Sequence, residues 1–137
     1  MTKQEFLAMS LPYGVKAIDK FECIWTIHPY KDALDTLRDN EHLSYENFIK
    51  EDGHKLILRP LSDLTKEIEH KGEKFVPMDR IAIYNPNNLC YFIECILTGM
   101  VEWIVVTKLI EWHFDIADLI SKGEAIDVNT LDVNPYK

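Results

Sequence analysis

The segment that most constrains the fold of this chain is residues 105–122, near the C-terminal end. Read as a helix, it places its charged side chains at steps of three and four residues, so that they form one narrow polar stripe. The stripe consists of Lys108, Glu111, Asp115, Asp118 and Lys122. Apolar residues fill most of the remaining circumference, and Gly123 follows as an ordinary helix stop. The pattern predicts an amphipathic helix over 105–122 with most of its surface buried.

His113 lies in this segment but off the polar stripe. A zinc site on a helix needs a second ligand three or four residues away, and those positions hold Ile116 and Ala117. We therefore interpret His113 as a buried structural histidine and the carboxylates around it as a solvated helix edge. The candidate functional residues are His113, Glu111, Asp115, Asp118 and Arg59. No catalytic, cofactor-binding or metal-binding role is predicted for any of them.

The rest of the chain has none of the usual catalytic or nucleotide-binding patterns. The glycines form neither G-x-G-x-x-G nor a Walker sequence, and no serine lies in a G-x-S-x-G context. The other histidines share no spacing typical of metal ligands; they are His28, His42, His54 and His70. The sequence therefore predicts no cofactor.

Charge and cysteine content limit the environment and the partners. The 23 acidic residues outnumber 15 basic ones, giving a net charge of −8, and no basic cluster is present. Direct nucleic-acid binding is therefore not expected.

The three cysteines are odd in number and lie in apolar runs, which favours reduced, buried thiols. The N-terminus lacks the apolar core of a signal peptide, and Glu94 and Glu102 interrupt the longest apolar stretches, so we expect a cytoplasmic protein without a membrane span.

The remaining elements are short and separated by turn residues. The other expected helices are 3–10, 30–40, a single turn at 61–65, and 77–82. The expected hairpins pair 15–18 with 21–28 around Asp19–Lys20, 46–50 with 55–59 around Asp52–Gly53, the strands flanking Lys71–Gly72, and 89–97 with 100–106 around Thr98–Gly99. A longer helix from Ser62 to His70 is the alternative to the hairpin at Lys71–Gly72.

These elements predict a single α+β domain over residues 1–137. Its short antiparallel strands are expected to form a sheet or partial barrel, with the C-terminal amphipathic helix packed on one face.

Three blocks of the sequence resemble small, uncharacterised proteins of bacteriophages and prophages of gut Bacteroidetes. The blocks are TKQEFLAMSLPYG, ILRPLSDLTKEIEHKGEKFVP and EWHFDIADLISKGEAIDVNTLDVNPYK. Together they cover a little under half of the chain. The resemblance implies a phage or prophage origin and a cytosolic accessory role in the host cell. It implies no activity and no functional residues.

The three blocks that resemble phage and prophage proteins are expected to form the scaffold of the domain. Segments 15–58 and 84–104 are expected to carry the binding specificity of this particular protein, because binding sites usually lie on variable segments held by a rigid frame. The favoured function is that of a non-enzymatic accessory protein that binds another protein or self-associates.

Two other functions stay open at this stage. One is an acidic mimic of nucleic acid that inhibits a host defence enzyme, suggested by the net charge and the acidic stripe. The other is a metal-dependent or acid–base enzyme centred on His113, which would need partners from distant positions such as Asp79, Glu94 or His70.

Overall fold

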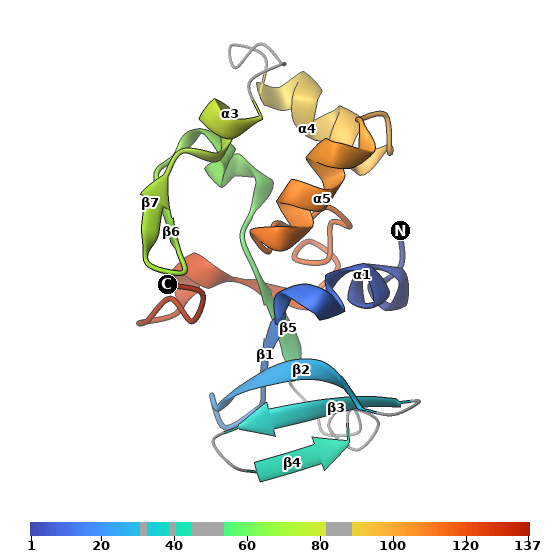
Figure 1. Ribbon diagram of the computed structural model, residues 1–137, viewed down its shortest axis with the longest axis vertical. Coiled ribbons are helices and arrows are strands. Elements are labelled where there is room, and N and C mark those ends of the chain that lie inside the picture. The colour runs from blue at the N-terminus through green and yellow to red at the C-terminus, as the bar shows by residue number, and fades with distance from the viewer. Residues whose placement is uncertain (31–32, 39–40, 45–53, 82–88) are drawn as a thin grey trace.

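A six-stranded sheet forms the frame of the protein in a computed structural model, which describes residues 1–30, 33–38, 41–44, 54–81 and 89–137 (Figure 1). The strand order is β4-β3-β2-β1-β5-β8, and neighbours are antiparallel except for β5 and β8. The strands are β1 (Lys16–Ile18), β2 (Ile24–Tyr30), β3 (Ala33–Arg38), β4 (Glu41–Ser44), β5 (Lys55–Leu58) and β8 (Ala125–Asp127). A separate two-stranded sheet pairs β6 (Ile68–His70) with β7 (Glu73–Phe75). The six strands form an open sheet and not a closed barrel.

Helices complete the α+β architecture that the sequence predicts. They are α1 (Lys3–Ser10), α3 (Pro77–Arg80), α4 (Leu89–Leu97) and α5 (Trp103–Glu111), with 3-10 turns at Leu11–Tyr13, Leu61–Thr65 and Val128–Thr130. Figure 1 shows α3, α4, α5 and the β6–β7 hairpin gathered at one end of the molecule, with β2, β3 and β4 at the other. None of the described helices has the length and apolar character needed to cross a membrane.

Strand β5 is covered on both faces because its side chains alternate between two cores. Leu56 and Leu58 belong to the main core, which also contains side chains of α1, α4 and α5. Ile57 points the other way, into a smaller core with Val128 and Tyr136 from the C-terminal segment. The helix expected to pack on one face is shorter than predicted: α5 (Trp103–Glu111) contributes Val105, Leu109 and Ile110 to the same core as Leu56 and Leu58.

Two predicted hairpins are confirmed. β1 pairs with β2, and the Asp19 carboxylate closes their turn by accepting hydrogen bonds from the amides of Phe21 and Cys23 at 2.8 and 2.9 Å. β6 and β7 are joined by Lys71–Gly72, whose φ angles of 51° and 80° are those of a tight two-residue hairpin turn. The helices expected at 3–10 and 77–82, the turn at 61–65 and the strand at 55–59 also form, with small shifts of their ends.

The hairpin predicted around Thr98–Gly99 is wrong, because residues 89–111 form the two helices α4 and α5. Gly99, with φ of 74°, ends α4 in a Schellman motif. Its amide donates to the carbonyl of Ile96 at 3.2 Å, and the amide of Met100 donates to that of Cys95 at 2.8 Å. A left-handed glycine serves a hairpin turn and a helix end equally well, so the sequence pattern did not separate them.

The helix predicted over 30–40 is also wrong. Residues Ala33–Arg38 form β3, which pairs on one side with β2 and on the other with β4. Pairing with two neighbouring strands outweighs the helical spacing of a few apolar residues. The strand expected at 46–50 and the turn at Asp52–Gly53 lie outside the described residues.

The helix predicted over 105–122 ends at Glu111, which breaks the polar stripe. His113 adopts a left-handed conformation with φ of 62°, and Asp118 does the same with φ of 57°, so the chain turns repeatedly where a straight helix was expected. The expectation of buried cysteines is wrong as well: Cys90 is exposed, and Cys23 and Cys95 are half-buried.

Candidate functional site

His113 lies two residues after Glu111, the last residue of α5, and takes part in the hydrogen bonds that end the helix. Its amide donates to the carbonyl of Ile110 at 3.0 Å, and the amide of Phe114 donates to that of Leu109 at 2.9 Å. These two bonds form a Schellman motif, in which the left-handed residue is usually glycine. A histidine here carries a backbone cost of about 1–2 kcal/mol that glycine avoids. The side chain of His113 must therefore contribute interactions that glycine lacks.

Arg59, directly after β5, forms hydrogen bonds with the backbone on both sides of His113. Its amide donates to the carbonyl of His113 at 2.8 Å, and its own carbonyl accepts from the amide of Asp115 at 2.9 Å. Its Nε donates to the carbonyl of Trp112 and its Nη2 to that of Glu69, each at 2.9 Å. Arg59 is only 3% exposed. Arg59 and His113 are thus brought together, and the guanidinium ties α5 to β6.

Tyr136 from the C-terminal segment packs beneath His113. The two rings are stacked, with centroids 3.8 Å apart. The hydroxyl of Tyr136 accepts from the amide of Lys16 at 2.8 Å and donates to the carbonyl of Ile57 at 2.7 Å. It thereby bridges the backbones of two residues that face each other across β1 and β5. Burial raises the pKa of this hydroxyl well above its usual range, so it stays protonated.

His70 brings a second imidazole to the same place. Its ring centroid lies 5.4 Å from that of His113, and the two residues are 6% and 1% exposed. Neither nitrogen of His70 has a hydrogen-bond partner, nor does Nδ1 of His113. Burial, with the charges of Arg59 and Lys71, lowers the pKa of His70 to about 4. Burial and nearby cationic groups also lower the pKa of His113 well below its usual range, so both rings are neutral at pH 7.

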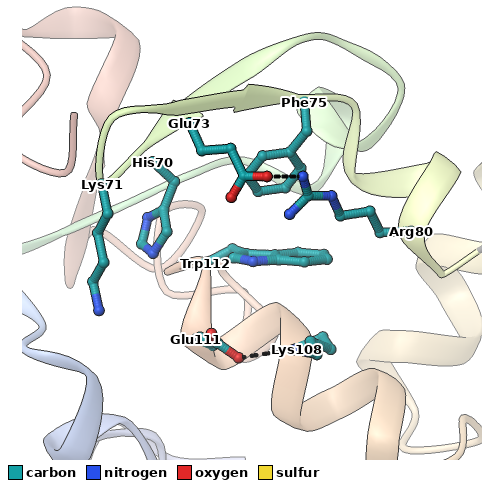
Figure 2. Close-up of a pocket in the computed structure, with 8 residues that line it drawn as sticks. All are labelled: His70, Lys71, Glu73, Phe75, Arg80, Lys108, Glu111 and Trp112. Carbon is teal, nitrogen blue, oxygen red and sulfur yellow. Dashed lines mark hydrogen bonds and ion pairs between the residues drawn. The ribbon is translucent and has the colours of Figure 1, made fainter.

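Two pockets meet at His70 and Lys71, which line both of them. The first has a volume of about 460 Å³ and is shown in Figure 2. In that view Glu73 and Arg80 pair above the indole of Trp112, while Lys108 and Glu111 pair below it. The carboxylates of this pocket are therefore already neutralised. The second pocket, of about 360 Å³, is bounded by His70, His113 and Tyr136.

The candidate carboxylates do not converge on His113. Glu111 lies in the first pocket, 3.4 Å from Nζ of Lys108. Asp115 is 4% exposed, and its two oxygens accept from the amides of Leu119 at 2.8 Å and Ile120 at 2.9 Å. Asp118 is exposed. Asp115 thus organises the turn after α5, and the acidic stripe does not exist as one surface.

The distant partners considered for an enzyme centred on His113 are only partly assembled. Of Asp79, Glu94 and His70, only His70 lies against His113; Asp79 and Glu94 are exposed and line neither of the two pockets. Within the described part of the chain, no three side chains of histidine, cysteine, aspartate or glutamate are placed to hold a metal ion.

A separate surface lies where α4 passes into α5. Four large apolar side chains there are exposed by 41%, 74%, 69% and 66%; they are, in order, Leu97, Met100, Trp103 and Ile104. We call these four residues the α4–α5 tip. Exposed glutamates occur on α4 (Glu94) and directly before α5 (Glu102). Among the described residues this is the densest run of exposed large apolar side chains along the chain.

The sequence named His70 only as one of three possible distant partners of His113, and it gave no indication of Tyr136 or the α4–α5 tip. The hairpin prediction hid the tip, because alternation along a strand assigns Trp103 and Ile104 to opposite faces, whereas the start of a helix leaves both exposed. The meeting of His70 with His113 depends on the path of the chain after α5, for which the sequence carries no local signal. Comparison of the chain with known protein families, characterised proteins and solved structures found no match.

Proposed function

We propose that this chain is a non-enzymatic accessory protein, of phage or prophage origin, that binds another protein in the host cytoplasm through the α4–α5 tip. The observation that carries the proposal is the exposure of Met100, Trp103 and Ile104, each by about two thirds or more. The resemblance of three sequence blocks to phage and prophage proteins supports the origin.

The composition of the tip is that of a binding surface. Tryptophan and methionine are enriched in protein interfaces, and tryptophan is among the residues that contribute most when buried there. Covering Trp103 and Ile104 would contribute about 2–3 kcal/mol each from removal of apolar surface from water. A run of such residues at one place on a monomer typically marks an interaction site.

Charge favours a different protein over a second copy of this one. Glu94 and Glu102 adjoin the tip, and the whole chain carries a net charge of −8. A second copy would bring the same carboxylates to the same interface, and like charges there oppose association. The partner expected is a protein with an apolar groove rimmed by lysine or arginine.

The position of the tip in the sequence agrees with this role. Residues Leu97 to Ile104 fall within segment 84–104, one of the two segments expected to be specific to this copy. A binding surface that changes between related proteins, on a scaffold that does not, would allow each copy to recognise its own partner.

The hypothesis of an acidic nucleic-acid mimic depended on a continuous stripe of exposed carboxylates. That stripe is not formed, because Asp115 is buried and Glu111 is paired with Lys108. An enzyme centred on His113 lacks a carboxylate directed at the imidazole among the described residues. Neither alternative has a specific observation in its favour.

Co-purification from a gut Bacteroidetes host tests the proposal. The wild type and the double variant Trp103→Glu/Ile104→Glu carry the same affinity tag, and bound proteins are identified by mass spectrometry. The matched control is Val133→Glu, which adds a carboxylate at a residue 68% exposed and outside the tip. Circular dichroism establishes that all three proteins are folded.

The expected result is one protein retained by the wild type and by Val133→Glu and lost from the double variant. Its retention should weaken with salt and with the charge reversals Glu94→Lys and Glu102→Lys, because these remove attraction to a basic rim. A partner retained equally by the double variant would refute binding through the tip. A concentration-dependent dimer in light scattering, lost in the double variant, would instead assign the tip to self-association.

A further inference from the structure

We propose that the pocket between His70, His113 and Tyr136 binds a small organic anion through its phosphate or carboxylate group. We call this pocket the imidazole pocket. Its volume is about 360 Å³. It is formed by the turn after α1, the start of β1, part of β2, the β6–β7 turn, the end of α5 and the C-terminal residues. Its lining includes Tyr13, Lys16, Thr26, His70, Lys71 and His113.

The imidazole pocket is lined by cationic groups in a chain that is acidic overall. Its charged side chains are Lys16, Lys71 and Lys137, its two imidazoles are neutral at pH 7, and none of its lining residues is an aspartate or glutamate. The net charge of the whole chain is −8. A concave site with one sign of charge concentrates ligands of the opposite sign. The ligand should therefore be an anion.

Lys16 is held in a position that lacks a counter-ion. Its Nζ donates to the hydroxyl of Thr26 at 2.8 Å, and among the described residues no carboxylate pairs with it. Burial lowers the pKa of this ammonium group, so its charge is partly deprived of water. An anion in the pocket would restore the missing stabilisation. Lys71, an exposed residue that also lines the pocket, likewise has no ion-pair partner in the described part of the chain.

The two histidines supply hydrogen-bonding atoms that the protein itself does not use. Three of their four ring nitrogens are buried without a partner, namely both of His70 and Nδ1 of His113. A buried polar atom left without a partner costs about 1–3 kcal/mol, so such atoms usually mark an unfilled requirement. Each neutral imidazole offers one N–H donor, and oxygen atoms of a phosphate or carboxylate are suitable acceptors.

The backbone conformation of His113 also indicates that its ring nitrogens serve a ligand. Stacking on Tyr136 explains an aromatic ring at this position, and phenylalanine would provide it without unpaired nitrogens. Instead the chain keeps a histidine in a left-handed conformation that favours glycine. A requirement for the ring nitrogens in ligand binding explains both costs together.

The volume sets the size of the ligand. About 360 Å³ is at the lower end of the range for small-molecule sites and exceeds what one inorganic oxyanion fills. The ring of Tyr13 provides an apolar contact for the organic part. The ligand class is therefore a metabolite-sized organic anion, with its oxyanion group directed at Lys16, Lys71 and the imidazoles.

Nuclear magnetic resonance of the protein labelled with ¹⁵N in histidine tests the site directly. Inorganic phosphate, a phosphate monoester and a dicarboxylate are titrated separately, and sodium chloride of matched ionic strength serves as the blank. The expected result is a saturable shift of the His70 and His113 ring signals with at least one of these oxyanions. Whether the phosphates or the dicarboxylate bind more tightly identifies the anionic group.

Lysine variants provide the matched comparison. Lys71→Asn removes the charge and leaves a residue that tolerates the left-handed backbone at this position, and it should weaken binding about tenfold. Lys74→Asn, on β7 and outside the pocket lining, should bind as the wild type does. Equal shifts with chloride, no saturation with any oxyanion, or unchanged affinity in Lys71→Asn would each overturn the proposal.

Discussion

The imidazole of His113 stacks on the ring of Tyr136, with centroids 3.8 Å apart and planes inclined by 17°. This contact joins the end of α5 to the C-terminal segment. Because Tyr136 also bridges Lys16 and Ile57, the stack links the helical end of the molecule to the centre of the sheet. The stability of the fold and the shape of the imidazole pocket therefore depend on the same pair of residues.

Replacing His113 with phenylalanine should separate the ring from its nitrogens. His113→Phe keeps an aromatic ring against Tyr136 and removes Nδ1, which has no partner. The free energy of unfolding in urea should stay within about 1 kcal/mol of the wild type or rise, because an unsatisfied polar atom is lost. Binding of oxyanions should weaken about tenfold, because one hydrogen-bonding imidazole is lost. A large loss of stability would show that the ring nitrogens have structural partners.

The glycine variant at position 113 measures how much the imidazole ring contributes to the free energy of unfolding. His113→Gly relieves the left-handed backbone but leaves a cavity beside Tyr136, so the free energy of unfolding should fall by about 2 kcal/mol. The difference between this variant and His113→Phe reports the contribution of the stacked ring. Equal stability of the two variants would contradict the account.

Removing the Tyr136 hydroxyl should destabilise the sheet. In Tyr136→Phe the amide of Lys16 and the carbonyl of Ile57 lose their bridging partner in a buried place. We expect a fall of about 2–3 kcal/mol in the free energy of unfolding, measured in urea. The control Tyr91→Phe removes a hydroxyl that bonds Cys95 at a residue 61% exposed. This change should cost less than about 1 kcal/mol, because water can replace that bond. Similar values for both variants would mean that the bridge contributes nothing.

Acid should destabilise the protein through His70. The pKa of His70 is about 4 in the folded protein against 6.5 for an ordinary histidine, because burial, Arg59 and Lys71 oppose its charge more than Glu111 and Glu73 favour it. The unfolded chain therefore binds the proton first as the pH falls. This stability is present above pH 6.5 and is lost toward pH 4, by up to about 3 kcal/mol.

The comparison for this prediction is His70→Gln, which cannot take up the proton. Urea unfolding of both proteins at several pH values from 7 to 4 should give a steeper loss for the wild type. His113, whose pKa is lowered by burial, His70, Arg59, Lys71 and Lys16, adds to the slope in both proteins. A His70 ring signal that titrates near pH 6.5 would contradict this explanation.

Gly99 should be required where α4 ends. Its φ of 74° is strained for any residue with a β-carbon, although nothing within 4 Å would contact that atom. Gly99→Ala should therefore lower the free energy of unfolding by about 1 kcal/mol through backbone strain alone, while Gly99→Asn should cost less. Thermal unfolding followed by circular dichroism measures both. A neutral alanine variant would favour a different chain path between α4 and α5.

Sequence patterns identified the elements whose signals are local. The Lys71–Gly72 hairpin turn, the Pro77 helix start and the Asp19 turn each depend on residues within a few positions, and all three form. The α+β class followed from the same elements. Their mutual arrangement did not follow, because the pairing of β5 with β1 and with β8 joins segments far apart in the sequence.

In the candidate site, too, local features could be predicted from the sequence and the spatial arrangement could not. His113 was correctly identified as buried, and Arg59 lies directly against its backbone. The carboxylates Glu111, Asp115 and Asp118 were placed on one helix edge because the spacing fits a helix throughout. The left-handed turn at His113 ends that helix, and histidine gives little warning of it because glycine is the usual residue there.

Photo-crosslinking from position 103 tests most directly whether the α4–α5 tip binds a protein partner. The wild-type sequence carries a photoreactive phenylalanine derivative in place of Trp103, or in place of Val133 as the control, and is irradiated in host lysate. We expect a crosslinked product of defined mass, other than twice that of the chain, from position 103 and not from position 133. The absence of any product specific to position 103, or a product of twice the chain mass alone, would contradict it.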